Sequence, residues 1–368
     1  MLDKKIREKV EKIEVFYLNS QRRVRCFCGE IVNNTIVRHL RKEHPEEWAR
    51  WGLSFVDLRN EGLYPYQIIR HFRTEDGRFL FTSSVVQKEI TKLVEKRGAK
   101  LDLSRKRKIG NWQPKAFVPE RSTIWSFKNR GSWSVHKGDY RGNWAPQIPR
   151  TLITLYSEED DFVLDPFVGG GTTLIETWLT NRKGIGIDVS PMAIAITESR
   201  INEMKKKAGN DPRIHLRDDL CPLLIEGDSR DLRDHMRKLK IEENSIQLVC
   251  AHPPYLNSLK YTDAIDSDLS KISDPEEFCG QLQLIAKEIQ RFMADDGTCA
   301  ILIGDLRRRR KVIPLGFMVM RAFREEKFKL KEIIIKIQHN DSSSRFWYPS
   351  RDKIDFLIAH EYLFIFGN

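Results

Sequence analysis

The sequence predicts an α/β fold whose doubly wound sheet is mostly parallel and ends in an antiparallel hairpin, preceded by a small, mainly helical N-terminal domain. Short β-branched runs alternate with helical patterns from about residue 115 onward, which is typical of βαβ units. A glycine-rich turn joins one of these runs to the helix that follows it. The last two apolar runs, 332–337 and 354–366, have no clear helix between them, so we expect an antiparallel pair.

The elements expected in the larger domain follow one another along the chain. Strands are predicted at 162–165, 184–188, 245–250 and 299–304. Helices are predicted at 172–181, from Pro191, from Pro275 and at 315–325. The helix after Pro275 keeps its apolar residues at helical spacing, namely Phe278, Leu282, Ile285, Ile289 and Phe292. In a sheet of this kind, ligand sites lie at the carboxyl ends of the strands.

The chain has 368 residues, which is more than one average domain holds. We expect a small module at 1–50, a helical segment with a linker at 51–110, and the α/β domain at 111–368. The basic run Arg105–Lys108 lies in that linker. A composition of 40% hydrophobic and 31% charged residues is typical of a globular protein. Because no membrane span or signal peptide pattern is found, we expect a cytoplasmic protein.

The chain is strongly basic, with a net charge of +11 and a pI near 9.3. Counterion release favours the binding of such proteins to nucleic acid, so we expect a polyanionic partner. The alternative is a basic surface that serves solubility alone. The six cysteines are scattered, apart from Cys26 and Cys28. This spacing favours reduced thiols over a disulfide framework.

The segment DPFVGGGTT (165–173) lies between a predicted strand and a predicted helix. Its glycines stand where the backbone must bend sharply and approach a ligand closely, although ordinary strand-to-helix turns also use glycine. Asp188 ends the next strand, where a carboxylate can accept hydrogen bonds from both ribose hydroxyls. The alternative role of Asp188 is to cap the helix that begins near Pro191.

These residues resemble the amino-methyltransferases of the N4-cytosine and N6-adenine DNA family, which carry DPFxGxGTT followed by an acidic residue at the end of the second strand. The absence of a Lys after the glycines distinguishes the segment from a triphosphate-binding loop. The resemblance implies a Rossmann-like methyltransferase sheet that binds S-adenosylmethionine. It assigns Asp188 to the ribose and Asp228 to the adenine of the cofactor. It assigns to the methionine part Asp165, Phe167, Gly169, Gly171 and Thr172.

The segment 125–153 resembles the part of the family that precedes the cofactor strand and closes over the methionine. Gln147 and Pro149 are the candidates that this resemblance gives. The alternative is that the segment's tryptophans, Trp125, Trp133 and Trp144, simply pack under the sheet.

The tetrapeptide His252-Pro253-Pro254-Tyr255 directly follows the strand predicted at 245–250, and its two prolines fix the backbone at the ligand-binding edge. An exocyclic amino group is a poor nucleophile because its lone pair is delocalised into the ring. It therefore needs hydrogen-bond acceptors, and a flat side chain must hold the flipped base. We expect Tyr255 to stack on the base, with the carbonyl of Pro253 and the side chain or carbonyl of His252 as acceptors. The alternative is a rigid turn with a packed tyrosine.

The family pattern places Ser, Asp or Asn before Pro-Pro-Tyr, so His252 is a departure that leaves its side-chain role open. HPPYLNSLKY (252–261) and HEYLFIF (360–366) resemble the N4-cytosine members more than the N6-adenine members. Gln338 and Asn340 are candidate contacts to the base edge. The resemblance thus implies a cytosine-N4 DNA methyltransferase. The alternatives are adenine N6, guanine N2 of RNA, and a DNA-binding protein that keeps a degenerate methyltransferase scaffold.

The N-terminal module contains two thiols and two imidazoles, from Cys26, Cys28, His39 and His44. This is the ligand set of a tetrahedral structural zinc site, and it resembles a two-Cys two-His finger whose cysteines stand unusually close. The alternative is a buried cysteine pair with two surface histidines. The stretch that follows predicts a helix-turn-helix reader, or else a helical spacer that packs on the core.

The order of the motifs leaves no room for a full target-recognition domain between or after them. We therefore expect the N-terminal 110 residues to read the sequence of double-stranded DNA. A cognate restriction enzyme is left open as a further partner, and no membrane partner is expected.

Overall fold

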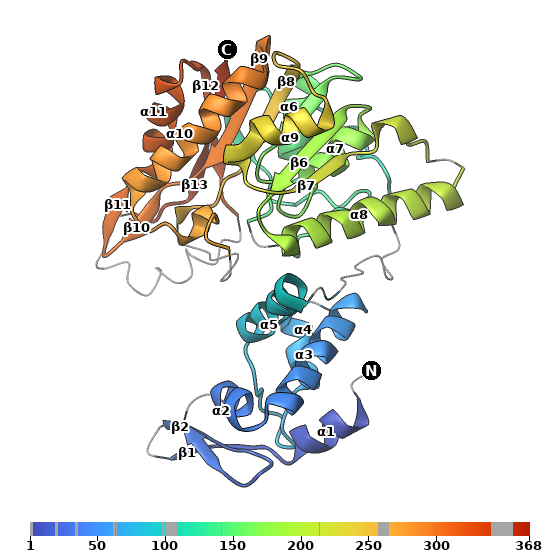
Figure 1. Cartoon of the computed structure of the whole chain (residues 1–368), viewed down its shortest axis with the longest axis vertical. Helices are drawn as coiled ribbons and strands as arrows, with labels where there is room; N and C mark the ends of the chain where they lie inside the picture. Colours follow the sequence, from blue (N-terminus) through green and yellow to red (C-terminus); the bar gives the residue numbers. More distant parts are fainter. Residues whose placement is uncertain are drawn as a thin grey trace. The chain divides into compact units, whose positions relative to one another are not determined.

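The computed structural model describes residues 3–18, 21–33, 36–61, 63, 65–97, 99, 109–140, 142–212, 214–256, 265–339 and 356–368. The chain divides into two compact units, Met1–Lys108 and Ile109–Asn368 (Figure 1). The expected linker run Arg105–Lys108 and the candidate Asn340 lie outside the described residues. Within the described residues, none of the helices has both the length and the apolar character needed to cross a bilayer.

An eight-stranded sheet organises the second unit. Its strands are β4 (Ile124–Ser126), β5 (Phe162–Asp165), β6 (Lys183–Asp188), β7 (Leu223–Glu226), β8 (Ile246–Ala251), β9 (Met293–Ile303), β12 (Lys329–Ile337) and β13 (His360–Gly367). They lie side by side in the order β4-β12-β13-β9-β8-β5-β6-β7. β13 is antiparallel to both neighbours, β12 and β9, whereas every other pair is parallel. The predicted fold class is confirmed.

Helices cover both faces of this sheet. They are α6 (Gln147–Tyr156), α7 (Thr172–Leu179), α8 (Pro191–Asn210), α9 (Leu232–Leu239), α10 (Pro275–Phe292) and α11 (Leu315–Glu325), with short 3-10 turns at Asp218–Leu220, Ser229–Asp231 and Leu269–Lys271. Successive strand residues point to opposite faces, as in the pairs Val163 and Leu164 or Leu248 and Val249. One face packs against α9, α10 and α11, and the other against α6, α7 and α8. Burial of both faces explains why the strands read as continuous apolar runs.

Several elements escaped the sequence analysis, among them β4, α6, β7 and α9. A further two-stranded hairpin, formed by β10 (Leu306–Arg308) and β11 (Lys311–Ile313), follows β9 directly. The strands at 162–165 and 184–188 and the helices from Pro191, Pro275 and 315 lie where they were predicted. Strongly apolar strands and capped helices were therefore the elements that pattern alone could place.

The first unit combines a small antiparallel sheet with helices. Its strands are β1 (Glu14–Leu18), β2 (Gln21–Arg25) and β3 (Ile31–Asn33), in the order β1-β2-β3. Its helices are α1 (Lys4–Glu11), α2 (Ile36–Glu43), α3 (Pro45–Asn60), α4 (Pro65–Ile68) and α5 (Ser83–Arg97), with a 3-10 turn at Ile69–His71. Aromatic residues from these helices and the segment between α4 and α5 pack together, namely Trp48, Trp51, Phe55, Phe72 and Phe81. The three strands are an addition to the helical module that the sequence predicted.

Candidate active site

A cavity opens at the carboxyl edge of the large sheet, where sheets of this kind place their ligand sites. Asp165 ends β5, Asp188 ends β6, Asp228 follows β7 by two residues, and His252 follows β8 directly. All four residues line the cavity. Because these strands are neighbours in the sheet, four segments distant in sequence meet at one site.

The glycine turn shapes one wall of the cavity through Gly169 and Gly170. Gly169 and Gly171 have φ angles of +51° and +75°, a region that favours glycine. A Cβ atom on Gly171 would lie 2.7 Å from Cγ2 of Thr197, so a larger residue would also clash. The turn leads into α7, whose first residue, Thr172, is buried beside Gly171. Thus Gly169 faces the cavity, whereas Gly171 and Thr172 form the support behind it.

Two carboxylates line the cavity, the buried Asp165 and the half-buried Asp188. Asp165 accepts hydrogen bonds from the backbone N–H of Phe167 and the hydroxyl of Thr173, and burial raises its pKa to about 7. Asp188 accepts from the N–H of Gly169 and of Ser190, each at 2.9 Å, and burial raises its pKa to about 6. A carboxylate oxygen has two lone pairs, so each oxygen of Asp188 can accept one more hydrogen bond. The pair therefore suits a ligand that brings positive charge and hydroxyl groups.

Asp228 is the third acidic residue of the cavity wall. Its carboxylate caps the turn at Ser229–Asp231 by accepting from the N–H of Arg230 at 2.9 Å. The guanidinium of Arg230 also bonds both carboxylate oxygens and reaches Gln281 on α10. Asp228 thus enters the cavity with its orientation fixed.

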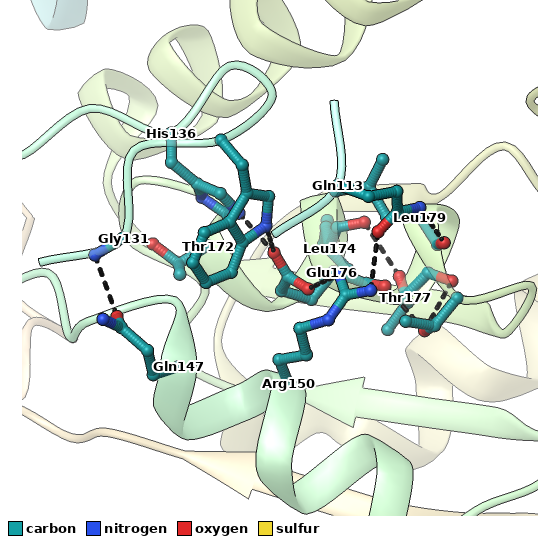
Figure 2. Close-up of polar contacts among 12 residues, drawn as sticks. Gln113, Gly131, His136, Gln147, Arg150, Thr172, Leu174, Glu176, Thr177 and Leu179 are labelled. Carbon is teal, nitrogen blue, oxygen red and sulfur yellow. Dashed lines mark hydrogen bonds and ion pairs between the residues drawn. The ribbon is translucent and has the colours of Figure 1, made fainter. Parts of the chain in front are cut away.

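A loop preceding α6 also lines the cavity and packs against the glycine turn; it contributes Tyr140, Gly142, Asn143 and Trp144. Glu176 of α7 anchors this loop. Its buried carboxylate accepts from the ring nitrogens of Trp133 and His136 and, at 2.8 Å, from the guanidinium of Arg150 on α6. Figure 2 shows His136 and Arg150 converging on Glu176. Three donors satisfy a charge that would otherwise be costly to bury.

Gln147 and Pro149, the candidates from this segment, are not among the residues that line the cavity. The side chain of Gln147 accepts from the N–H of Gly131 at 2.9 Å and donates to the carbonyl of Asn129 at 2.8 Å. Pro149 is buried within α6. Gln147 therefore braces the base of the loop, and Trp144 is the tryptophan of the segment that faces the cavity.

The tetrapeptide after β8 contributes His252 and Pro254 to the cavity wall. The ring of Trp144 stacks on the imidazole of His252, with centroids 5.6 Å apart and an interplanar angle of 22°. The hydroxyl of Tyr255 lies 3.1 Å from Nε2 of His252 and donates to Glu361 at 2.8 Å. Lys336 of β12 donates to the other oxygen of Glu361 at 2.6 Å. Trp144 of the loop, Glu361 of β13 and Lys336 of β12 therefore hold His252 and Tyr255 in place.

The protons of this cluster can be assigned from its chemistry. Burial alone would raise the pKa of Glu361, but the charge of Lys336 and the hydrogen bonds outweigh burial, so the pKa is lowered. An ionised Glu361 can only accept, and the single hydroxyl proton of Tyr255 is therefore directed at it. Nε2 of His252 must then donate to the oxygen of Tyr255. Because burial lowers the pKa of His252 to about 4, the ring is neutral, and its Nδ1 is an unprotonated acceptor.

Glu361 and Trp144 are the site residues whose roles the sequence analysis missed. The signal for Glu361 was an acidic residue at the start of an otherwise apolar strand, HEYLFIF. Its side chain is 7% exposed, and a buried carboxylate usually has a specific partner. Gln338 uses its backbone N–H to extend the β12–β13 pairing to Ala359.

A second cluster lies in the first unit. The Sγ atoms of Cys26 and Cys28 and ring nitrogens of His39 and His44 all lie within 4.8 Å of one another. The two cysteines come from the turn between β2 and β3, where Gly29 has a φ of +93°. His39 lies on α2, and His44 precedes α3. Ligand atoms of a tetrahedral zinc site lie about 3.5 Å apart, so this donor set fits zinc with a small contraction.

Sequence and structure comparisons extend these observations. Residues 7–199 match the profile of the family N6_N4_Mtase, described as DNA methylase. This range includes the glycine turn but not the tetrapeptide. The chain is 32% identical over 99 residues to the Type II methyltransferase M.BglI of Bacillus subtilis, which covers 24% of this chain and 28% of that protein. It is 46% identical over 60 residues to M.MthZI of Methanothermobacter thermautotrophicus, covering 16% and 17%.

These matches span less than a third of the length of the curated relatives. Among solved structures, a TehB-like SAM-dependent methyltransferase from Corynebacterium glutamicum aligns with a TM-score of 0.33 and 13% identity. The alignment covers 60% of this chain and 86% of that one.

Proposed function

Because the chain belongs to the N6_N4_Mtase family of DNA methylases, we propose that it transfers a methyl group from S-adenosylmethionine to the exocyclic amino group of a flipped DNA base. One observation carries the proposal. A single cavity is lined both by the carboxylates Asp165 and Asp188 and by the neutral acceptor His252. A direct transfer needs the methyl donor and the amino group in contact, and this cavity offers both binding sites within one space.

The acidic residues of the cavity would hold the cofactor. Asp188 would accept the ribose hydroxyls on its remaining lone pairs, and Asp165 would hold the cationic methionine part. Asp228 would bind the adenine, with Arg230 fixing its carboxylate. When bound, S-adenosylmethionine supplies an electrophilic methyl group. Because Gly169 has no side chain, the methionine part of the cofactor could approach the backbone closely there. Gly171 and Thr172 would stabilise the turn without contacting the cofactor.

The tetrapeptide would hold and activate the target amine. Nδ1 of His252 accepts one amino hydrogen, and the carbonyl of Pro253 accepts the other, which favours a tetrahedral nitrogen with a localised lone pair. Pro254 keeps the backbone rigid, and the ring of Tyr255 stacks on the flipped base. Glu361 and Lys336 act through Tyr255 as positioning residues. The histidine thus replaces the Ser, Asp or Asn of the family pattern by presenting an equivalent acceptor.

Cytosine N4 is the preferred target, supported by the resemblance of HPPYLNSLKY and HEYLFIF to N4-cytosine members. Adenine N6 is the alternative within the same chemistry. Purified protein, incubated with unmethylated plasmid DNA and cofactor, is expected to produce N4-methylcytosine in the nucleoside digest, measured by mass spectrometry. If the digest contains N6-methyladenine instead, only the assignment of the target base is wrong. An unmodified digest would reject the proposal.

The first unit would supply sequence selectivity and hold a structural zinc ion. Cys26, Cys28, His39 and His44 are the proposed ligands, supported by the convergence of their donor atoms. Glu30 lies 3.4 Å from Nδ1 of His39, where it can orient that ring for binding through Nε2. Zinc at this position would join the β2–β3 turn to α2 and fix the helix for reading DNA.

A further inference from the structure

The β10–β11 hairpin has five consecutive cationic residues, Arg307, Arg308, Arg309, Arg310 and Lys311. The hairpin pairs Leu306 with Ile313 and Arg308 with Lys311, so the two middle arginines form its tip. Arg309, Arg310 and Lys311 are exposed. Neither the cofactor cavity nor the metal cluster uses any of these side chains. A concentrated positive charge on a short hairpin thus remains without a role.

The hairpin begins beside the proposed target-base site. Gly304 and Asp305 separate it from β9, and a Cβ atom on Gly304 would lie 3.1 Å from the Tyr255 ring and 3.3 Å from Cγ of Glu361. At about 3.4 Å per residue, the tip lies at most about 17 Å from Gly304. Duplex DNA carries about one negative charge per 1.7 Å of axis. Phosphates on both sides of a flipped nucleotide therefore fall within reach of the hairpin.

Backbone carbonyl groups accept hydrogen bonds from the two arginines at the base of the hairpin. The guanidinium of Arg307 donates to the carbonyls of Arg310 and Phe356, and that of Arg308 donates to the carbonyl of Ser273. These bonds fix direction without neutralising charge. Within the described part of the chain, no ion pair joins a carboxylate to Arg309, Arg310 or Lys311, whereas carboxylates pair with Arg217, Arg291 and Arg321 elsewhere.

The tip residues also adopt an unfavourable backbone. Arg309 and Arg310 have φ angles of +48° and +68°, where two-residue hairpin turns normally place Asn and Gly. Each non-glycine residue in this region costs on the order of 1 kcal/mol. Arginine at both positions therefore lowers local stability, which is typical of residues kept for binding.

We propose that the β10–β11 hairpin binds the DNA backbone beside the flipped base, with Arg309, Arg310 and Lys311 on its phosphates. This inference rests on the proposed DNA substrate. The contacts are independent of base sequence, so the hairpin positions the duplex while the first unit selects the site. Because the hairpin begins near Tyr255, it would bind the DNA backbone at the position where extrusion of the base distorts that backbone.

The test is the double variant Arg309→Asn/Arg310→Gly in the full chain. Asn-Gly is the preferred pair at this turn, so the hairpin is retained and the melting temperature does not fall. The matched control is Arg324→Gln/Lys327→Asn, which removes two exposed charges, one in the last turn of α11 and one just after it, where Lys327 has a φ of +72°. That site precedes β12 and lies at the opposite edge of the sheet.

Binding of a labelled 30-base-pair duplex is measured by fluorescence anisotropy between about 50 and 200 mM KCl. Loss of two phosphate contacts is expected to reduce the slope of log K against log salt by about 1.8 and to weaken binding several-fold. Cofactor binding, measured by calorimetry, is unchanged. A slope equal to those of the wild type and the control would overturn the inference. The same titration is run with a single-stranded RNA probe. A loss of affinity seen only with that RNA probe would also overturn the inference.

The inference and the proposed function can fail separately. If the wild type methylates duplex DNA and the hairpin variant does so with an unchanged KM for DNA, only the hairpin assignment is wrong. If the wild type neither binds nor methylates duplex DNA, the proposed function is wrong as well.

Discussion

Tyr255 donates its hydroxyl proton to Glu361 across 2.8 Å, although 106 positions separate the two residues in the chain. The bond connects the loop after β8 with the start of β13. It also determines which nitrogen of His252 carries a proton, because the hydroxyl has no second proton to give. A residue on the last strand thus sets the acceptor offered to the substrate.

Glu361→Gln is expected to lower kcat by on the order of tenfold to a hundredfold, because a neutral amide no longer enforces this proton arrangement and misplaces the acceptor. The Kd for cofactor, measured by calorimetry, is expected to stay unchanged. Glu332→Gln, an exposed change on β12, is the matched control. A wild-type kcat in the E361Q enzyme would show that Glu361 does not position Tyr255 and His252.

His252→Asn is expected to retain activity within about tenfold, whereas His252→Leu loses on the order of a hundredfold or more, since only Asn keeps an acceptor. Single-turnover methylation measures the chemical step directly. Equal activity in the two variants would show that the His252 side chain does not contact the amine. In that case its backbone carbonyl would remain as the acceptor.

Cofactor affinity is expected to fall as the pH falls from 8 to 6. Burial raises the pKa of Asp165 to about 7, and a cationic ligand needs the ionised form. The loss should be about tenfold over this range if one group titrates. Calorimetry in buffers of different ionisation enthalpy should also detect proton release on binding near pH 6. Asp165→Asn should bind weakly at every pH, and a pH-independent wild type would contradict the assignment.

The same shift affects folding stability. The pKa of Asp165 is raised in the folded state, so its neutral carboxyl group stabilises folding. This stabilisation is fully present below about pH 4 and is lost as the pH rises through about 7. Bound cofactor should offset this loss. The increase in melting temperature on adding S-adenosylmethionine is therefore expected to be larger at pH 8 than at pH 6. An equal increase at both values would argue against ionised Asp165 in the complex.

The metal cluster gives a prediction of its own. Purified protein should contain a single zinc equivalent by elemental analysis, and Cys28→Ala should lose it together with sequence-selective binding to duplex DNA. Cys221→Ala, outside the cluster, is the control and should keep both. Cofactor binding should survive in both variants, since Asp165 and Asp188 belong to the other unit. Full zinc content in the C28A variant would reject the ligand set.

The sequence predicted those parts of the fold and site that depend on neighbours in the chain. The strand at 162–165 and the helix from Pro191 could be placed because apolar runs and caps are local signals. The glycine turn was recognised from residue types alone, since its positive φ angles favour glycine. The contacts of Tyr255 with Glu361 and of His252 with Trp144 depend on β13 lying next to β9 and on a loop folded over the edge.

The first unit was harder to predict for a physical reason. Its strand β2 reads Gln-Arg-Arg-Val-Arg, and of its described side chains Val24 is the buried one. A strand with so little apolar surface has no alternating pattern to detect. The basic hairpin after β9 was missed for the same reason, because charged residues occupy most of it.

The central claim is amino methylation of DNA, and one measurement tests it most directly. The protein is expressed in a host free of DNA methylation, and the genomic DNA is sequenced for modified bases beside a Tyr255→Ala variant. We expect N4-methylcytosine in one recurring sequence context, and we expect it to be absent from the variant. Unmodified DNA together with modified RNA in the same cells would contradict it.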